Sequence, residues 1–243
     1  MGNAINKLIK HYNNVEKKKN EYKFGKVLGC GSFGVVRECI NKETNEVYAV
    51  KIIKKKKKHK KNYNFEKMVK NEIKYLSVMS HENIIKFKDF FEDKNKFYIV
   101  LEKCEGGELF YKVVKNKCLM ESESAQIVRQ AENFLFKNKN TKNIKLIDFG
   151  MAKKVNCEYL TELCGSPHYI SPELIRKKYT MSSDIWALGD EILNKNINWK
   201  GKEFSSLSVE AIDFLKKLLE RNEKKRLTAC QALNHPWIKS QVE

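Results

Sequence analysis

A glycine-rich stretch constrains the fold of this chain more than any other feature. Residues Leu28 to Val36 contain the spacing G-x-G-x-x-G, which dinucleotide-binding folds also use at a loop that opens a helix. Here the loop continues as a predicted strand, Val35 to Ile40, and a second predicted strand, Val47 to Ile53, follows a polar turn. This pattern predicts an antiparallel hairpin whose glycines let the backbone approach phosphate groups closely.

A lysine, Lys51, lies in the middle of the second predicted strand among apolar neighbours. An unpaired ammonium group would be costly there, so Lys51 needs an anion, which could be a phosphate or a carboxylate. The next predicted helix, Phe65 to Met79, carries Glu72 on its otherwise apolar face. We therefore predict a Lys51–Glu72 ion pair, and a solvated Glu72 is the alternative.

Two short apolar runs later in the chain predict a second hairpin. They are Ala131 to Phe136 and Lys145 to Gly150, joined by a Lys- and Asn-rich turn. Asn133 leads into the first run and Asp148 leads out of the second, so an amide and a carboxylate could converge at one end of the hairpin. Oxygen ligands of this kind suit Mg²⁺. The alternative is a surface hairpin with a chance Asp-Phe-Gly sequence.

Composition narrows the classes of partner and compartment. The net charge of +18 over 243 residues favours acidic partners such as phosphate groups, nucleic acid or anionic lipid. Seven cysteines without a C-x-x-C pair argue against a disulfide framework or a zinc site and indicate a reducing compartment. No apolar run approaches the length of a membrane span. We expect a cytoplasmic protein.

The order of these motifs resembles that of eukaryotic protein kinases. The resemblance covers roughly residues 22–238 and rests on the glycine-rich stretch, the Lys51 strand, Glu72, Asn133 and the Asp-Phe-Gly sequence. Two further stretches, His81 to Ile85 and Glu102 to Phe110, resemble the calcium/calmodulin-dependent group, and within it the calcium-dependent protein kinases of plants and protozoa. The resemblance implies an α+β, bilobal fold with an antiparallel sheet and one helix in the first lobe. The second lobe would be mainly helical.

The resemblance also implies domain boundaries. Residues 1–21 would be a basic N-terminal extension, residues 22–238 the kinase domain, and residues 239–243 a tail. Within the kinase domain the first lobe would span about residues 22–101. The second lobe, truncated, would span about residues 105–238.

The resemblance implies a site for ATP and Mg²⁺. Lys51 would hold the α and β phosphates, Glu72 would hold Lys51, and Asp148 with Asn133 would hold the metal. Leu101 would guard the adenine pocket, and the backbone of Glu102 and Cys104 would bind the base. Glu108 would lie near the ribose or a basic peptide substrate. The ATP-binding positions are Leu28, Gly29, Cys30, Gly31, Ser32, Phe33, Gly34, Val35, Val36, Ala49, Lys51, Leu101, Glu102, Cys104 and Glu108.

The segment after the Asp-Phe-Gly sequence resembles a kinase activation segment, which implies protein substrates with Ser or Thr near basic residues. Thr161 is the favoured phosphorylation candidate, because Ser166 matches a position that usually faces substrate. The alternative is that neither is phosphorylated. Glu173 would pair with Arg226. Asp184, at the start of a helix predicted for Ser182 to Gly189, would bond the catalytic-loop backbone.

Two family segments are absent from the sequence. Gln130 runs directly into Ala131 where the rest of a long helix and the His-Arg-Asp sequence should lie, and Gly189 runs directly into Asp190. Loss of a positioned base costs typically about 10²–10⁴-fold in rate. Each lost helix segment would bury several apolar side chains worth about 1.5–3 kcal/mol each. We therefore expect a loose or unfolded second lobe, in which Asp184, if still buried, would lose its partner at about 1–3 kcal/mol.

Both losses keep the reading frame, a pattern that suggests skipped exons or a faulty gene model. The first hypothesis is a serine/threonine protein kinase of the calcium-dependent type that is inactive in this form. The second is a catalytically dead ATP-binding or scaffolding pseudokinase, and the third is a basic nucleic-acid-binding protein. The third fits least well, because the motifs account for the chain better than its charge does.

Three peripheral features complete the expectations. Gly2 is a lipidation candidate, although Asn6 stands where Ser or Thr is usual, and a basic amphipathic start could add weak membrane association. The alternative is a helix that packs on the domain. The basic run Lys54 to Lys61 is interpreted as a solvated loop, with nucleic-acid binding or nuclear targeting as the alternative. No EF-hand loop occurs in the sequence.

Overall fold

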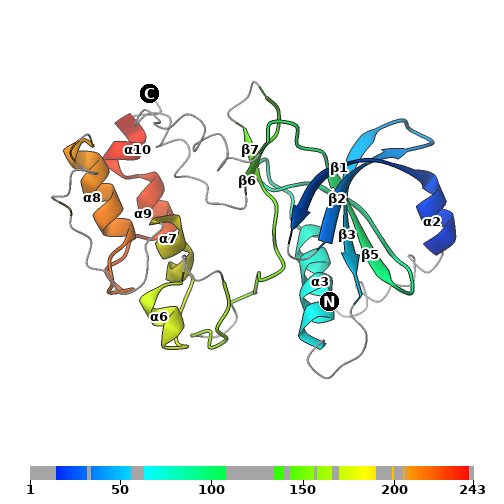
Figure 1. Cartoon of the computed structure of the whole chain (residues 1–243). Coiled ribbons are helices and arrows are strands. Elements are labelled where there is room, and N and C mark those ends of the chain that lie inside the picture. Colours follow the sequence, from blue (N-terminus) through cyan, green and yellow to red (C-terminus); the bar gives the residue numbers. More distant parts are fainter. Residues whose placement is uncertain are drawn as a thin grey trace. The chain divides into compact units, whose positions relative to one another are not determined.

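The computed structural model describes residues 15–31, 34–55, 63–107, 134–139, 143–155, 158–165, 170–189, 199, 205 and 207–240 (Figure 1). The chain divides into two compact units. The first comprises residues 1–108 and 134–152, and the second comprises residues 109–133 and 153–243. Each unit has a buried apolar core of its own.

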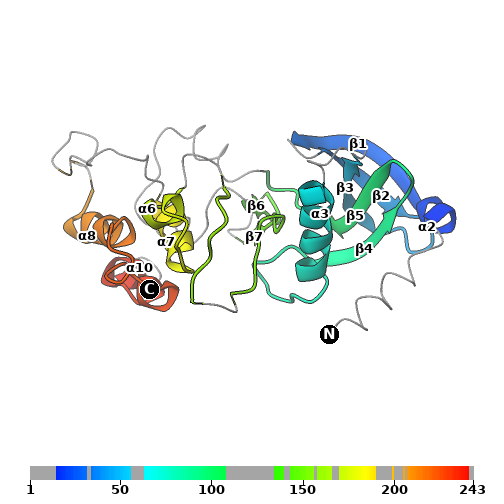
Figure 2. The ribbon, with the colours of Figure 1, turned by 90° about the horizontal axis from the view of Figure 1, so that it is seen from below.

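The first unit is built on a five-stranded antiparallel sheet with strand order β1-β2-β3-β5-β4. Helix α3 lies against this sheet and a short helix, α2, precedes it (Figures 1 and 2). The elements are α2 (Val15–Glu21), β1 (Tyr22–Gly31), β2 (Gly34–Asn41), β3 (Val47–Lys54), α3 (Tyr63–Leu76), β4 (Phe87–Glu92) and β5 (Lys96–Glu102).

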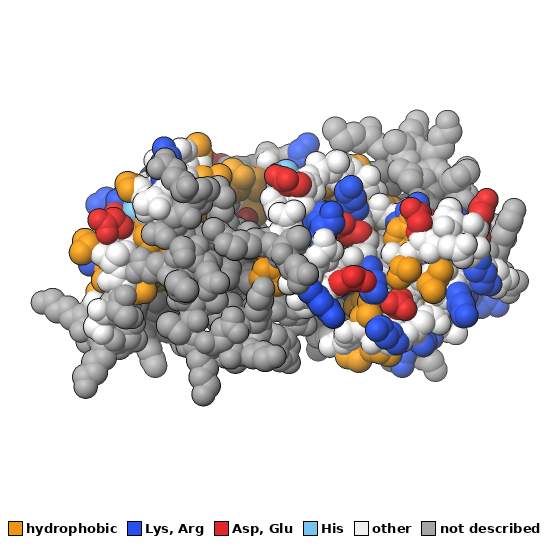
Figure 3. Space-filling view, turned by 90° about the horizontal axis from the view of Figure 1, so that it is seen from above, with side chains coloured by type: hydrophobic (Ala, Val, Ile, Leu, Met, Phe, Trp, Pro, Cys, Tyr) orange, Lys and Arg blue, Asp and Glu red, His pale blue; other side chains and the backbone are white. Residues whose placement is uncertain are grey.

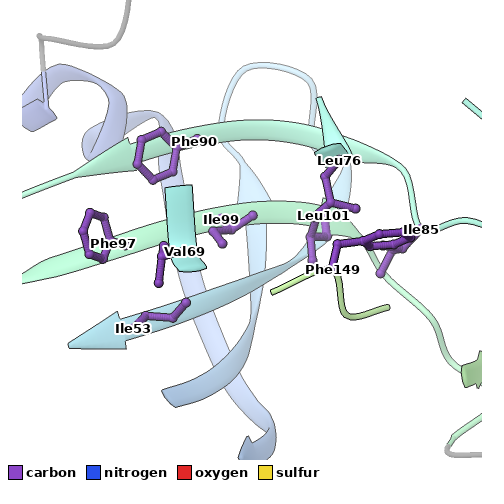
Figure 4. Packing of buried hydrophobic residues seen from close by; sticks show 9 residues of the cluster. All are labelled: Ile53, Val69, Leu76, Ile85, Phe90, Phe97, Ile99, Leu101 and Phe149. Atoms are coloured by element: carbon purple, nitrogen blue, oxygen red, sulfur yellow. The ribbon is translucent and has the colours of Figure 1, made fainter. Parts of the chain in front are cut away.

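Strand β5 is buried on both faces, and its side chains alternate between two apolar clusters, as the two-residue period of a strand requires. Phe97, Ile99 and Leu101 point to the cluster that α3 covers with Val69 and Leu76 (Figure 4). On the opposite face the cluster consists of Tyr22, Cys39, Val50, Phe91, Tyr98 and Val100. The sheet is therefore a packed layer, and β5 ends at Glu102, where the segment predicted to bind the base (the hinge, Glu102 to Cys104) begins.

Helix α2 is fixed to the sheet by charge. The Lys18 ammonium lies 2.7 Å from the carboxylate of Asp89, a buried residue of β4, and the Lys19 ammonium lies over the Tyr98 ring. The end of the predicted N-terminal extension is thus a helix docked on the first unit. Gly2 and the rest of residues 1–14 lie outside the described part of the chain.

The second predicted hairpin is present as β6 (Phe134–Phe136) and β7 (Ile144–Leu146), an antiparallel pair. Backbone hydrogen bonds join it to the segment that follows β5: the Gly106 amide donates to the Phe136 carbonyl, and the Phe136 amide donates to the Gly107 carbonyl. A side chain at position 106 would bring its Cβ within 2.3 Å of the Phe136 Cβ, so this approach requires glycine. The hairpin therefore groups with the sheet, whereas the sequence boundaries placed it in the second lobe.

The described part of the second unit is helical. Its elements are α6 (Pro172–Ile175), α7 (Ser182–Gly189), α8 (Val209–Leu218), α9 (Ala229–Leu233) and α10 (Pro236–Ser240). Ser208 caps α8, and Thr228 with Gln231 forms a capping box at the start of α9. Helices α7, α8, α9 and α10 share a core made of Ile185, Ala211, Phe214, Leu218, Ala232, Trp237 and Ile238.

The α+β fold expected from the sequence is confirmed: a sheet with one covering helix, followed by a partial helical region. The described helices of the second unit pack on one another, so this part has a core despite the missing segments. The residues that flank the Gln130–Ala131 junction lie outside the described ranges, as does Asp190 at the second junction. None of the described helices has the length and apolarity needed to span a membrane.

A buried ion pair holds the second unit together. Arg226 Nη2 lies 2.9 Å from Glu173 Oε2, and both residues are at least 95% buried. Arg226 Nη1 also donates to the Ser182 carbonyl, and its guanidinium lies over the Trp186 ring. Burial alone would raise the pKa of Glu173, but the hydrogen bonds and charge of Arg226 outweigh burial and hold that pKa below its ordinary value.

We expect Arg226→Met to destabilise the second unit by about 3–5 kcal/mol, because it leaves the Glu173 carboxylate buried and uncompensated. Urea unfolding followed by circular dichroism measures the loss. Lys217→Met, at an exposed pair with Asp213, is the control and should cost less than about 1 kcal/mol. Equal losses of stability in the two variants would contradict the view that the buried Arg226–Glu173 ion pair stabilises the second unit.

The same pair predicts a pH dependence for the wild-type chain. Because the folded pKa of Glu173 is lowered, its contribution to stability is complete above the unfolded value of about 4.3 and is lost as the pH falls through the folded value. The difference in stability between wild type and Arg226→Met should therefore shrink as the pH falls, because Glu173 in the variant lacks the charge that lowers its pKa and takes up a proton at higher pH.

Candidate functional site

The structure brings Lys51 and Glu72 together inside the first unit. Lys51 is in β3, paired with Ile99 of β5, and its Nζ lies 2.6 Å from Glu72 Oε1 on α3. The side chains are only 15% and 4% exposed, respectively. The pair forms because the apolar face of α3 packs on the sheet and carries one acid into that contact.

Burial dominates the electrostatics of Glu72. Burial raises its pKa, the ammonium of Lys51 lowers it, and the nearby charge of Asp148 raises it again, so the net shift is upward. Lys51 therefore opposes the effect of burial on the pKa of the Glu72 carboxyl. We therefore expect the stability of the first unit to depend strongly on Lys51.

Asp148 belongs to the same cluster. The Gly150 amide donates to Asp148 Oδ1 at 2.9 Å, and a Cβ built on Gly150 would lie 3.2 Å from that oxygen and 3.9 Å from Glu72 Oε2. Within the described ranges, no donor bonds the other carboxylate oxygen of Asp148. That oxygen suits Mg²⁺, which commonly takes one or two carboxylates together with substrate phosphates and water.

No group of three or more potential metal ligands among His, Cys, Asp and Glu occurs in the described ranges. The second predicted metal ligand, Asn133, lies outside the part of the chain that the structure describes.

Phe149 fixes the position of Asp148. Its ring is buried in the apolar cluster beside Leu76, Ile85 and Leu101, so that the neighbouring carboxylate is held at the edge of that core (Figure 4). An anchor of this kind is stiffer than a loop contact because the interior is close-packed.

A further contact was not anticipated from the sequence. The side-chain amide of Asn71 donates to the Ala152 carbonyl at 2.6 Å, which ties α3 to the backbone just beyond the Asp-Phe-Gly sequence. Asn71 directly precedes Glu72, and this adjacency was the only available signal. Nothing local in the sequence pairs it with a residue 81 positions later.

The predicted adenine end also lies in the first unit. Ala49 and Leu101 are buried partners across β3 and β5, and β5 ends at Glu102. Among the described residues, the Cys104 amide has no hydrogen-bond acceptor, whereas those of Glu105 and Gly106 donate to the β6–β7 hairpin. Burial, followed by the charge of Glu102, raises the pKa of the Cys104 thiol to about 11, so the thiol stays neutral.

The glycine-rich stretch forms a hairpin, as the sequence predicts, and does not open a helix. Gly31 pairs with Gly34, and a Cβ on Gly34 would lie 2.1 Å from the Ile52 carbonyl oxygen, so glycine is required there. A Cβ on Gly29 would meet no described atom within 4 Å. Leu28 and Val35 are exposed hydrophobic side chains on this hairpin, Cys30 is exposed and Val36 is partly buried. Ser32, Phe33 and Glu108 lie outside the described part of the chain.

The remaining predicted residues belong to the second unit. Thr161 is exposed and follows Leu160, whose backbone pairs with Tyr179, and Ser166 lies outside the described ranges. Asp184 is an exposed residue, although desolvation of its carboxyl still raises the pKa of that group above the ordinary value. The cost predicted for a buried, partnerless Asp184 therefore does not apply in full.

We expect Lys51→Met to destabilise the chain more at about pH 7.5 than at about pH 5. An acid with a raised folded pKa supports the fold at low pH and loses that support as the pH rises from its unfolded value, near 4.3, through the folded value. Removal of Lys51 raises the pKa of Glu72 further and widens this window. Thermal unfolding at the two pH values measures the effect.

The double variant Lys51→Met/Glu72→Gln is the matched control, because it lacks the titrating carboxyl and should lose the additional pH dependence. A loss of equal size at both pH values in the single variant would show that the pair is not coupled as described.

Comparison with known families gives a match to the protein kinase domain over residues 22–131 and 129–198. The match breaks at residues 129–131, where the sequence runs from Gln130 into Ala131. The two matched stretches together cover more than half of the chain.

Several curated proteins are similar to this chain. Calcium-dependent protein kinase 14 of Arabidopsis thaliana is 34% identical over 266 residues, which cover 91% of this chain and 50% of the relative. Calcium/calmodulin-dependent protein kinase cmkB of Emericella nidulans is 34% identical, covering 89% of this chain and 65% of the relative. Myosin light chain kinase A of Dictyostelium discoideum is 32% identical, covering 90% and 88%.

The chain spans about half the length of the calcium-dependent protein kinases it matches. The alignment with calcium-dependent protein kinase 14 is 266 positions long, but the 91% of this chain that it covers is only about 221 residues. About 45 aligned positions therefore carry no residue of this chain, which agrees with the absence of two internal segments. The matched domain, the similar proteins and the cluster of Lys51, Glu72 and Asp148 all indicate the same family. This chain belongs to the protein kinase family, among the serine/threonine kinases of the calcium-dependent and calmodulin-dependent group.

Proposed function

We propose that the first unit binds Mg-ATP in the manner of a calcium-dependent-type serine/threonine kinase, and that the chain in this form does not transfer the phosphate. The observation that carries the binding proposal is the cluster of Lys51, Glu72 and Asp148 in one unit with the end of β5. These residues supply a cation for phosphate oxygens and a carboxylate for the metal.

The charge of the cluster supports a metal-bound nucleotide. Glu72 neutralises Lys51, which leaves the negative charge of Asp148 facing whatever anion binds there. A bare triphosphate would be repelled by that carboxylate, whereas Mg²⁺ between the carboxylate and the phosphates removes the repulsion. Asp148 would hold the metal, which would supply positive charge for the phosphate oxygens.

The transfer step lacks its proton acceptor. The chain contains no His-Arg-Asp sequence, and in kinases the Asp of that sequence accepts the proton of the substrate hydroxyl. Absence of such a base lowers the rate typically by about 10²–10⁴-fold. Loss of the helix that positions Asn133 adds to this deficit.

A scaffolding pseudokinase is the second candidate. Each unit keeps an apolar core of its own although the base is absent, and a scaffold needs only folded surfaces. Nucleic-acid binding is the weaker third candidate. On the face of the first unit shown in Figure 3, acidic side chains are interspersed among the basic ones of the described residues, so that face does not favour it.

Several finer roles belong to this proposal. Protein substrates would offer Ser or Thr near basic residues. Thr161 would be the phosphorylated position of the activation segment. The protein would be cytoplasmic, and a lipid on Gly2 would give it weak, peripheral association with a membrane.

We expect wild-type protein to bind ATP with a requirement for Mg²⁺, measured by isothermal titration calorimetry with and without a chelator. Lys51→Met should weaken binding at least about tenfold, because the phosphates lose their cation. Lys88→Met, which removes an exposed lysine 3.7 Å from Glu46, is the control and should leave affinity unchanged. If a folded wild-type chain does not bind ATP in the presence of Mg²⁺, the proposed nucleotide binding is wrong and the scaffolding pseudokinase is favoured.

A further inference from the structure

A second lysine is buried in the first unit, and the nucleotide site described above does not use it. Lys145 lies in β7, three residues before Asp148, and is 2% exposed. Its Nζ lies 2.9 Å from Glu102 Oε1, at the end of β5, and within 3.4 Å of the Ile84 carbonyl oxygen. An ammonium in such a place is tolerated only with a partner, and Glu102 is that partner.

Glu102 is itself held in place on two sides. Its amide donates to the Lys86 carbonyl at 2.9 Å, and its carboxylate accepts from the Lys86 amide at 2.7 Å. Its side chain thus bonds a backbone amide and an ammonium at once. The position of the hinge backbone that begins at Glu102 is therefore coupled to the position of β7.

The strip Asn83–Lys86 lies between these two elements. The Leu146 amide donates to the Asn83 carbonyl, the Ile85 amide donates to the Leu146 carbonyl, and the Asn83 side chain donates to the Ile144 carbonyl. The strip is thus bonded to β7 on one side and, through Lys86, to the end of β5 on the other. Lys145 adds the direct link between the two sides.

We propose that the Lys145–Glu102 ion pair is a positioning element that fixes the distance between the adenine-binding end of the site and Asp148. This rests on the proposed function, because the two ends matter together only to a ligand that spans them. Adenine would bind at the hinge after Glu102, and the metal and phosphates would bind at Asp148. A ligand that reaches both ends gains from their fixed spacing, whereas a ligand that reaches one end does not.

The test compares two ligands of different reach on the full chain. We expect Lys145→Met to weaken Mg-ATP binding about tenfold and to weaken adenosine, which lacks the phosphates, less than about threefold. Equal losses for both ligands would overturn the proposal, because they would show support of the adenine end alone. No loss for either ligand, together with a lower melting temperature, would overturn it as well, because the pair would then be merely structural.

Two further variants serve as controls, one for a general loss of stability and one for a failure of Lys145→Met to fold. Lys18→Met breaks another ion pair of the first unit, with Asp89, and should lower stability without a change in either affinity. If Lys145→Met does not fold, Lys145→Met/Glu102→Gln removes both charges, and loss of a complete buried pair is better tolerated than loss of one partner. The glutamine can still accept from the Lys86 amide, and we expect the same selective loss of Mg-ATP binding.

Hydrogen exchange on the nucleotide-free chain separates this proposal from the proposed function. In Lys145→Met, but not in Lys18→Met, amide exchange should become faster both in residues 103–107 and in residues 144–152. If wild type does not bind Mg-ATP but this paired change occurs, the function proposal fails and the positioning role stands. If exchange is unchanged in either segment, the positioning role is wrong whatever the nucleotide does.

Discussion

The contact between Lys51 and Glu72 places two groups of opposite charge against each other inside the first unit. Burial pushes the pKa of Glu72 upward, and the ammonium opposes that shift at 2.6 Å. The pair also joins the central sheet to α3, so the energetics of one contact link the two layers of the unit. Asp148 lies close enough to influence the same carboxylate, which extends the coupling to the predicted metal end.

The contacts around this pair form a connected frame. Phe149 anchors the Asp-Phe-Gly sequence in the core, and Asn71 ties α3 to Ala152 beyond it. On the other side of the site, Gly106 allows the β6–β7 hairpin to approach the segment after β5, and Lys145 pairs with Glu102. Consequently every described element of the proposed nucleotide site belongs to the first unit, and the site does not depend on the second unit for these contacts.

Local pattern predicted much of this arrangement. Alternating apolar runs indicated both hairpins and the helix over most of its length, and the cost of a buried ammonium was enough to predict the Lys51–Glu72 contact. The Asn71–Ala152 and Lys145–Glu102 contacts were missed because they join residues 81 and 43 positions apart, and neither partner has a local signature. The grouping of the β6–β7 hairpin with the sheet was missed for a similar reason, since backbone bonds to Gly106 and Gly107 decide it.

The central claim is that the nucleotide-binding end of a kinase site persists here without the group that accepts the substrate proton. Single-turnover transfer from γ-labelled ATP to a basic Ser/Thr peptide, at saturating Mg²⁺ and enzyme, tests this claim most directly. We expect the nucleotide to be bound and the transfer rate of the wild-type chain to be no higher than that of Lys51→Met. A wild-type rate well above that of the variant would contradict this expectation, because some group other than the missing Asp would then have to accept the proton of the substrate hydroxyl.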